Sequence, residues 1–202
     1  MTDQLFLSIW LDRTGKKNRL RQFEKLLRLF PFSQREQPQS VTSILAINNT
    51  EPPLLERPVT GPVEIDQVLA TFADYNGDDV AYTLESWWDL WVYDEDWKLT
   101  PTRVLLSCFG ADFDNGSDYA AREQEDLRID FGVDSRYLPD SEIAGSARLV
   151  ASNVTSLLRV VHEADATLHV ARRQLQTESG KNFAEHLEVT LRSQAAAASK
   201  PN

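Results

Sequence analysis

Ala81 to Tyr93, AYTLESWWDLWVY, is the stretch that decides the fold, because it holds three of the five tryptophans and alternates with a period of two. Successive side chains of a strand point to opposite faces, so this pattern predicts a β-strand with two unlike sides. One side is expected to be ordinary core: Tyr82, Leu84, Ser86, Trp88, Leu90 and Val92. The other side mixes acids with large aromatic rings: Thr83, Glu85, Trp87, Asp89, Trp91 and Tyr93.

Two further segments show the same alternation. In the strand expected over Thr102 to Gly110, the outward positions are Arg103, Leu105, Ser107 and Phe109. In the strand from Asp126 to Asp134, the charged residues fall on the side opposite Leu127, Ile129, Phe131 and Val133. If the three strands are neighbours, one sheet face gathers the residues that we select as a candidate site: Glu85, Trp87, Asp89, Trp91, Arg103, Phe109, Arg128 and Asp130.

This mixed face has three interpretations. Large aromatic side chains carry about 150–250 Å² each, so an uncovered group of them approaches the largest apolar patch that soluble monomers tolerate. The C-terminal helices would make the face a second small core, or a protein partner or a second copy would make it an interface. In the third interpretation the face is a pocket, with Trp87 and Trp91 as stacking walls and with Glu85, Asp89, Arg103 and Asp130 as polar contacts.

The remaining periodicity predicts an α+β fold with a mainly antiparallel sheet of about five to six strands and helices packed on it. Helices are expected over Lys16–Phe30, Pro62–Phe72 and Ala147–Asp165, followed by a helix pair or a broken helix. The order of elements begins like a ferredoxin-type split βαβ unit with a C-terminal helical extension. Residues 1–193 are expected to form a single domain, and residues 194–202 a disordered tail.

The net charge of −10 argues against general nucleic-acid binding, which depends on neutralising phosphates. The charge is uneven, because Arg13 to Arg28 contains seven basic residues and one acid, a local charge of +6. Asp112 to Asp130 contains seven acids and two arginines. We therefore expect the basic and acidic segments to contact each other within one fold.

No motif in the chain specifies a reaction, so the catalytic residues are unknown at this stage. Cys108 is the only cysteine, which excludes an internal disulfide and a multi-thiolate zinc site. Gly15-Lys16 lacks the glycine spacing of a phosphate-binding loop, and no Gly-x-Ser-x-Gly nucleophile motif occurs. No metal and no cofactor are expected.

The sequence favours a cytoplasmic protein of bacterial style. No segment approaches the roughly 20 apolar residues of a membrane span, and the N-terminal apolar run is too short for the core of a signal peptide. Our first hypothesis is a non-enzymatic module that binds a protein partner or its own copy through the aromatic and acidic sheet face. The alternative is a small-molecule-binding protein or an enzyme with a pocket on that face.

Overall fold

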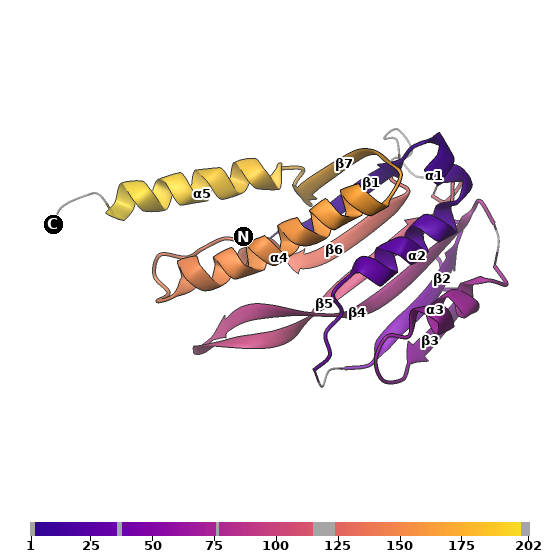
Figure 1. The fold of residues 1–202 in the computed structure, drawn as a ribbon, viewed down its shortest axis with the longest axis horizontal. Coiled ribbons are helices and arrows are strands. Elements are labelled where there is room, and N and C mark those ends of the chain that lie inside the picture. Colours follow the sequence, from indigo (N-terminus) through magenta and orange to yellow (C-terminus); the bar gives the residue numbers. More distant parts are fainter. Residues whose placement is uncertain (1–2, 36–37, 76, 115–123, 199–202) are drawn as a thin grey trace.

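The computed structural model describes residues 3–198 except 36–37, 76 and 115–123, with side chains described as far as residue 192. One seven-stranded sheet dominates this part, with the strand order β3-β2-β4-β5-β6-β1-β7 (Figure 1). Its strands are β1 (Gln4–Leu11), β2 (Ser40–Ala46), β3 (Leu55–Val59), β4 (Val80–Asp94), β5 (Asp96–Phe109), β6 (Leu127–Val133) and β7 (Val170–Thr177).

The long hairpin of β4 and β5 is the centre of this sheet. Its pairing runs without a bulge from Ala81 opposite Phe109 to Asp94 opposite Asp96, and Glu95 closes the turn with a φ of 62°. An unbroken register keeps every second side chain on the same face. The distal half of the hairpin extends beyond the neighbouring strands, since β2 pairs with β4 only up to Glu85.

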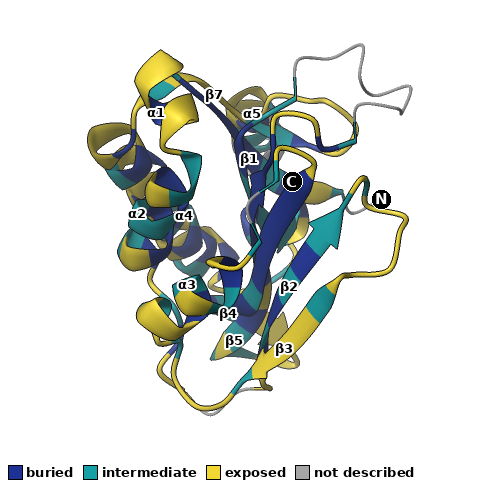
Figure 2. Ribbon diagram, turned by 90° about the vertical axis from the view of Figure 1, so that its right-hand side faces the viewer, coloured by how far each residue is buried: buried dark blue, intermediate teal, exposed yellow. Residues whose placement is uncertain are grey.

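Four helices lie on one side of the sheet: α1 (Arg13–Lys17), α2 (Arg19–Leu29), α3 (Ile65–Phe72) and α4 (Ser146–Thr167) (Figure 2). We call this side the covered face and the opposite side the open face. The apolar stripes of α2, α3 and α4 pack on the covered face, where Leu7, Leu84, Leu106 and Ile129 are fully buried. The alternation of β4 thus buries Trp88 in the main core and sends Trp87 to the open face.

The final helix, α5 (Phe183–Ala198), begins in the main core and continues past the end of the sheet (Figure 1). Phe183 is buried against Tyr137, with ring centroids 6.2 Å apart, whereas Val189 and Leu191 are exposed. The tail predicted from residue 194 starts inside α5, whose helical backbone reaches Ala198, and residues 199–202 lie outside the described part. No described helix is both long and apolar enough to cross a membrane.

The fold is of the predicted α+β class with an antiparallel sheet, but the expected number of strands was too low. The segment predicted as a helix pair or broken helix contains β7, which pairs with β1. β7 carries Ala171, Arg172, Arg173 and Gln174, which favour helices intrinsically, and its pairing with β1 overrides that preference. All strand pairings of the described sheet are antiparallel, so the ferredoxin-type unit, which contains a parallel pair, is not shown.

The basic and acidic segments meet at Asp126, as expected from their opposite charges. The Asp126 carboxylate is nearly buried, accepts a 2.9 Å hydrogen bond from the Leu11 N–H, and lies 3.4 Å from Arg19 Nε and 3.8 Å from Lys16 Nζ. A buried carboxylate needs such partners to offset its desolvation. Residues 115–123 of the acidic segment lie outside the described residues.

Candidate functional site

The register of the sheet places all eight residues of the candidate site on the open side of the sheet. Phe109 is nevertheless buried there, in a second small cluster with Ala81 and Phe113. On the hairpin, Trp87 lies opposite Arg103 and Glu85 lies opposite Leu105. Leu105 in turn neighbours Asp130 of β6, and Asp130 neighbours Phe6 of β1. One row of the face therefore runs Glu85, Leu105, Asp130, Phe6 and Gln176, and the next runs Thr83, Ser107, Arg128, Ser8 and Gln174.

The charged residues at the centre of the open face form an ion pair. Arg103 and Glu85 lie diagonally across the hairpin, with Nη2 of the arginine 2.6 Å from Oε2 of the glutamate. The hydrogen bond to Glu85 raises the pKa of Arg103, and the charge of Asp130 acts in the same direction. Asp130 also accepts a 2.8 Å hydrogen bond from the Gly132 N–H. Both carboxylates therefore have hydrogen-bonding partners within the sheet.

Arginine side chains lie over the aromatic rings on the β6, β1 and β7 side of the open face. The Arg128 guanidinium lies 4.9 Å from the Phe6 ring centroid and 5.7 Å from that of Phe109, and it also pairs with Glu125. The Arg172 guanidinium lies 3.8 Å from the Trp10 centroid. Such cation–π contacts shield the rings from water and contribute about 0.5–1 kcal/mol each where they are exposed.

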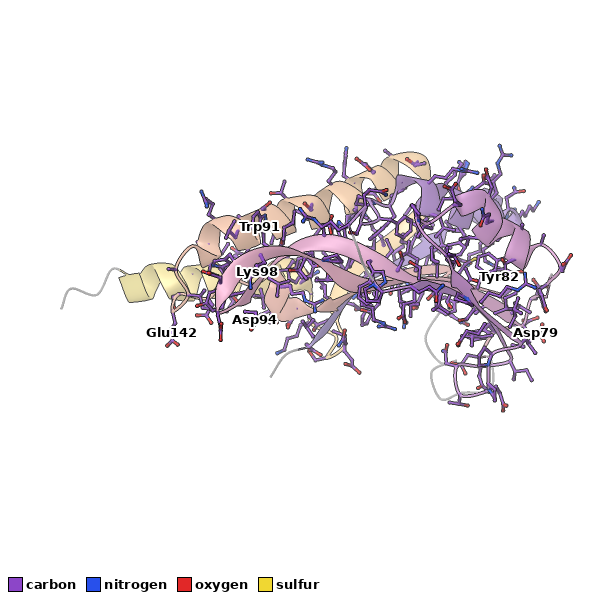
Figure 3. All side chains as sticks on the ribbon, turned by 90° about the horizontal axis from the view of Figure 1, so that it is seen from below. Asp79, Tyr82, Trp91, Asp94, Lys98 and Glu142 are labelled. Atoms are coloured by element: carbon purple, nitrogen blue, oxygen red, sulfur yellow. The ribbon has the colours of Figure 1, made fainter. Side chains whose placement is uncertain are left out.

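Asp89 and Trp91 belong to a separate group on the distal hairpin. Asp89 accepts a 2.7 Å hydrogen bond from the Ser33 hydroxyl and lies 3.5 Å from Arg35 Nε. Trp91, Lys98 and Asp94 are all located towards the free end of the molecule, far from Tyr82 and Asp79 (Figure 3). An open depression of about 670 Å³ lies here, lined by Arg35, Trp91, Trp97, Lys98, Leu99, Thr100 and Pro101.

Asn153 of α4 fixes the backbone of this distal strand. Its side-chain amide donates a 2.9 Å hydrogen bond to the Trp91 carbonyl and accepts one of 2.9 Å from the Trp91 N–H, as a neighbouring strand would. The same amide donates to the carbonyl of Arg136. Trp97 is held separately, because its indole N–H donates a 2.8 Å hydrogen bond to the carbonyl of Ala144. The hairpin is therefore anchored to the helical layer, and its aromatic side is held in a fixed orientation.

Several open-face residues were missed by sequence reasoning. Phe6 and Trp10 lie in the apolar run Leu5–Leu11, which predicts a strand buried on both sides. Ser8 and Trp10 are indeed buried on this side of β1, and only Phe6 is half-buried, under Arg128. Arg172 lies on β7, which was predicted as helix. Arg35 and Trp97 come from a loop and from the turn side of the hairpin, and only the aromatic character of Trp97 hinted at a role.

The open face offers aromatic surface and paired charges. Cys108 lies on the covered face, and burial raises the pKa of its thiol to about 12, which opposes formation of a nucleophilic thiolate. Within the described part of the chain, no group of three or more histidine, cysteine or acidic side chains is placed to hold a metal ion.

Comparison with models of known protein families, with curated proteins and with solved structures finds no match to this chain.

Proposed function

We propose that this protein is a non-enzymatic binding module that docks a protein surface on its open sheet face. The observation that supports this is the composition of the face: partly buried Trp87, Trp91, Leu105 and Phe6 surround paired charges, and none of the described helices packs over them. Protein interfaces favour this combination, in which aromatic residues and arginine are enriched and the charged groups are paired.

The alternative, a pocket for a small molecule, has weaker support. Sites for small ligands usually enclose 70–90% of the ligand surface in a concave cavity. The depression between Arg35 and Trp97 is open, and the face around Leu105 is a sheet surface with side chains lying across it. A broad surface of this kind suits a partner that is itself broad.

The test uses two adjacent leucines of β5 that point to opposite faces. We expect Leu106→Ala, on the covered face, to lower the free energy of unfolding by about 2–5 kcal/mol, since Leu106 is fully buried. We expect Leu105→Ala, on the open face, to lower it by less than about 1 kcal/mol. Urea denaturation followed by circular dichroism measures both values.

Equal losses for the two variants would show that the open face serves the fold, and the proposal would then be wrong. A second outcome would favour the alternative function. If the protein binds a compound from a metabolite panel, and if Trp91→Ala abolishes the change in tryptophan fluorescence while Leu105→Ala leaves it intact, the distal depression is a ligand pocket. Protection of Trp87 and Leu105 from hydroxyl-radical labelling in intact expressing cells, relative to dilute purified protein, supports the docking surface.

A further inference from the structure

We infer that the surface docked on the open face is a second copy of this chain, related by a two-fold axis that runs along the strands. This inference rests on the proposed function, because it names the partner of the same face. Two sheets would then pack face to face about 10 Å apart, as in a β-sandwich. Three properties of the face support this arrangement: its net charge, the distribution of its signs and its size.

The open face is close to neutral although the chain is strongly acidic. Its strand positions carry four carboxylates, Glu56, Glu85, Asp89 and Asp130, against three arginines, Arg103, Arg128 and Arg172. The whole chain carries a net charge of −10, so most other surfaces of two copies would repel each other. A partner of strongly basic character would instead be matched by an acidic face. Near-neutrality at this surface therefore favours self-association.

The signs of the charges are separated across the width of the face. Three of the four carboxylates, Glu56, Glu85 and Asp89, lie on the β3 and β4 side, and two of the three arginines, Arg128 and Arg172, lie on the β6 and β7 side. The exceptions are Asp130 on β6 and Arg103 on β5, which pairs with Glu85. A two-fold axis along the strands near β5 places β3 of each copy over β7 of the other, so that Glu56 of one copy lies close to Arg172 of the other. An axis across the strands would place each strand over its own copy, with like charges together. Charge complementarity thus selects the first arrangement.

The face is also large enough for a stable dimer. Seven strands with about 4.8 Å between neighbours span about 29 Å, and average strand lengths of about 25 Å give an area on the order of 700 Å² for the whole face. The corner that holds Ala81, Phe109, Ser8 and Trp10 is already buried within the monomer, which leaves roughly 500 Å². A specific interface needs about 500 Å² on each partner. The centre of this area holds Leu105, Trp87, Phe6 and Val41, which would supply the apolar contact.

Charge reversal at the two edges of the face tests the arrangement. The wild-type protein is expected to sediment as a dimer at a concentration of about 100 µM. Sedimentation at this concentration detects any association with a dissociation constant in the micromolar range. We expect Glu56→Arg and Arg172→Glu, taken singly, each to weaken dimerisation by about tenfold, because each change puts like charges together at two symmetry-related places. The double variant, with both signs exchanged, is expected to return to within about threefold of the wild type.

Arg57→Glu and Arg173→Glu are the matched controls, since each lies next to a test position in sequence and points to the covered side of its strand. Both are expected to leave the dimer unchanged. If Glu56→Arg and Arg172→Glu leave dimerisation unchanged, the dimer interface lies elsewhere on the molecule and the inference is overturned. A monomeric wild type would also overturn it. In that case, retention of the difference between Leu105→Ala and Leu106→Ala would leave the proposed function standing with a different protein partner.

Discussion

The two faces of the sheet bury aromatic rings in different ways. On the covered face, Trp88 is 4% exposed and packs against Phe30, Phe131 and Tyr137, with ring centroids 5.5, 5.6 and 6.4 Å away. On the open face, arginine side chains lie over the rings of Phe6 and Trp10. Phe109 and Phe113 pack ring on ring there, with centroids 5.8 Å apart. A ring packed among other rings is fixed by shape, whereas an arginine can move aside when another surface arrives. The rings of the covered face are thus held more rigidly than those that lie under arginine side chains on the open face.

The largest difference between the two faces is expected in thiol reactivity. Because burial raises the pKa of Cys108 to about 12, only about one thiol in ten thousand is ionised at pH 8. The thiolate is the species that iodoacetamide alkylates, so the folded wild-type protein is expected to stay unlabelled for hours. A cysteine introduced by Leu105→Cys, in a Cys108→Ala background, is expected to react more than about 1000-fold faster.

Intact mass spectrometry of samples quenched over time measures both rates. Protein unfolded in urea provides the control, since Cys108 should then react at the ordinary rate of an exposed thiol. Rapid labelling of folded wild-type protein would contradict the burial of Cys108 on the covered face.

The adjacent tryptophans of β4 give the next largest effect. We expect Trp88→Ala to lower the free energy of unfolding by about 3–5 kcal/mol, because it leaves a cavity among three aromatic rings of the main core. Trp87→Ala, one residue earlier and on the open face, is expected to cost less than about 2 kcal/mol. Urea denaturation measures both losses, and similar values would mean that the faces are equally part of the core.

Asn153 links the two regions and is expected to have an intermediate effect. Asn153→Ala removes three hydrogen bonds to partly buried backbone groups of Trp91 and Arg136, so we expect a loss of about 1–3 kcal/mol in the free energy of unfolding. The effect on hydrogen exchange at Trp91 is more specific than the effect on the free energy of unfolding. Hydrogen exchange of the Trp91 amide should accelerate by more than tenfold, because its acceptor is lost.

Thr155→Ala is the control for Asn153→Ala, since the Thr155 hydroxyl bonds only within its own helix, to the Ala151 carbonyl, among the contacts described. If both variants leave exchange at Trp91 unchanged, α4 does not fix the distal hairpin.

Much of the covered face could be predicted from the sequence because its signal is local. The alternation from Tyr82 to Val92 predicts which side chains of β4 enter the core, and the unbroken pairing with β5 preserves that pattern. The long helix α4 was predicted from its apolar spacing to within two residues at each end. The number of strands was not predictable in this way, because the alternation of β7 is weak and its pairing with β1 joins segments about 165 residues apart.

The open face was predictable only in part. Period-two alternation gives the direction of each side chain, and it indicates that Glu85 and Arg103 share a face. It gives no information about which strands are neighbours, so Phe6, Trp10 and Arg172 were not expected beside Arg128 and Phe109. Partners from loops were likewise not expected, because the contact of Asp89 with Ser33 depends on tertiary structure. The proposed dimerisation itself stays a prediction.

The smallest expected effect concerns Ile47, in the turn that follows β2. Its φ of 72° is rare for a β-branched residue, and its side chain is 61% exposed. Two backbone hydrogen bonds hold this conformation, from the Ile47 N–H to Asp79 (2.9 Å) and from the Asp114 N–H to the Ile47 carbonyl (2.6 Å). The left-handed conformation costs an L-residue about 1–2 kcal/mol, and glycine adopts it freely at an entropic cost of about 0.5–1 kcal/mol.

Ile47→Gly is therefore expected to raise the free energy of unfolding by about 0.5–1 kcal/mol. Leu54→Gly, at a similarly exposed position without a positive φ, should lower it by a similar amount, and urea denaturation of both variants shows whether the strain at Ile47 or the loss of its side chain dominates.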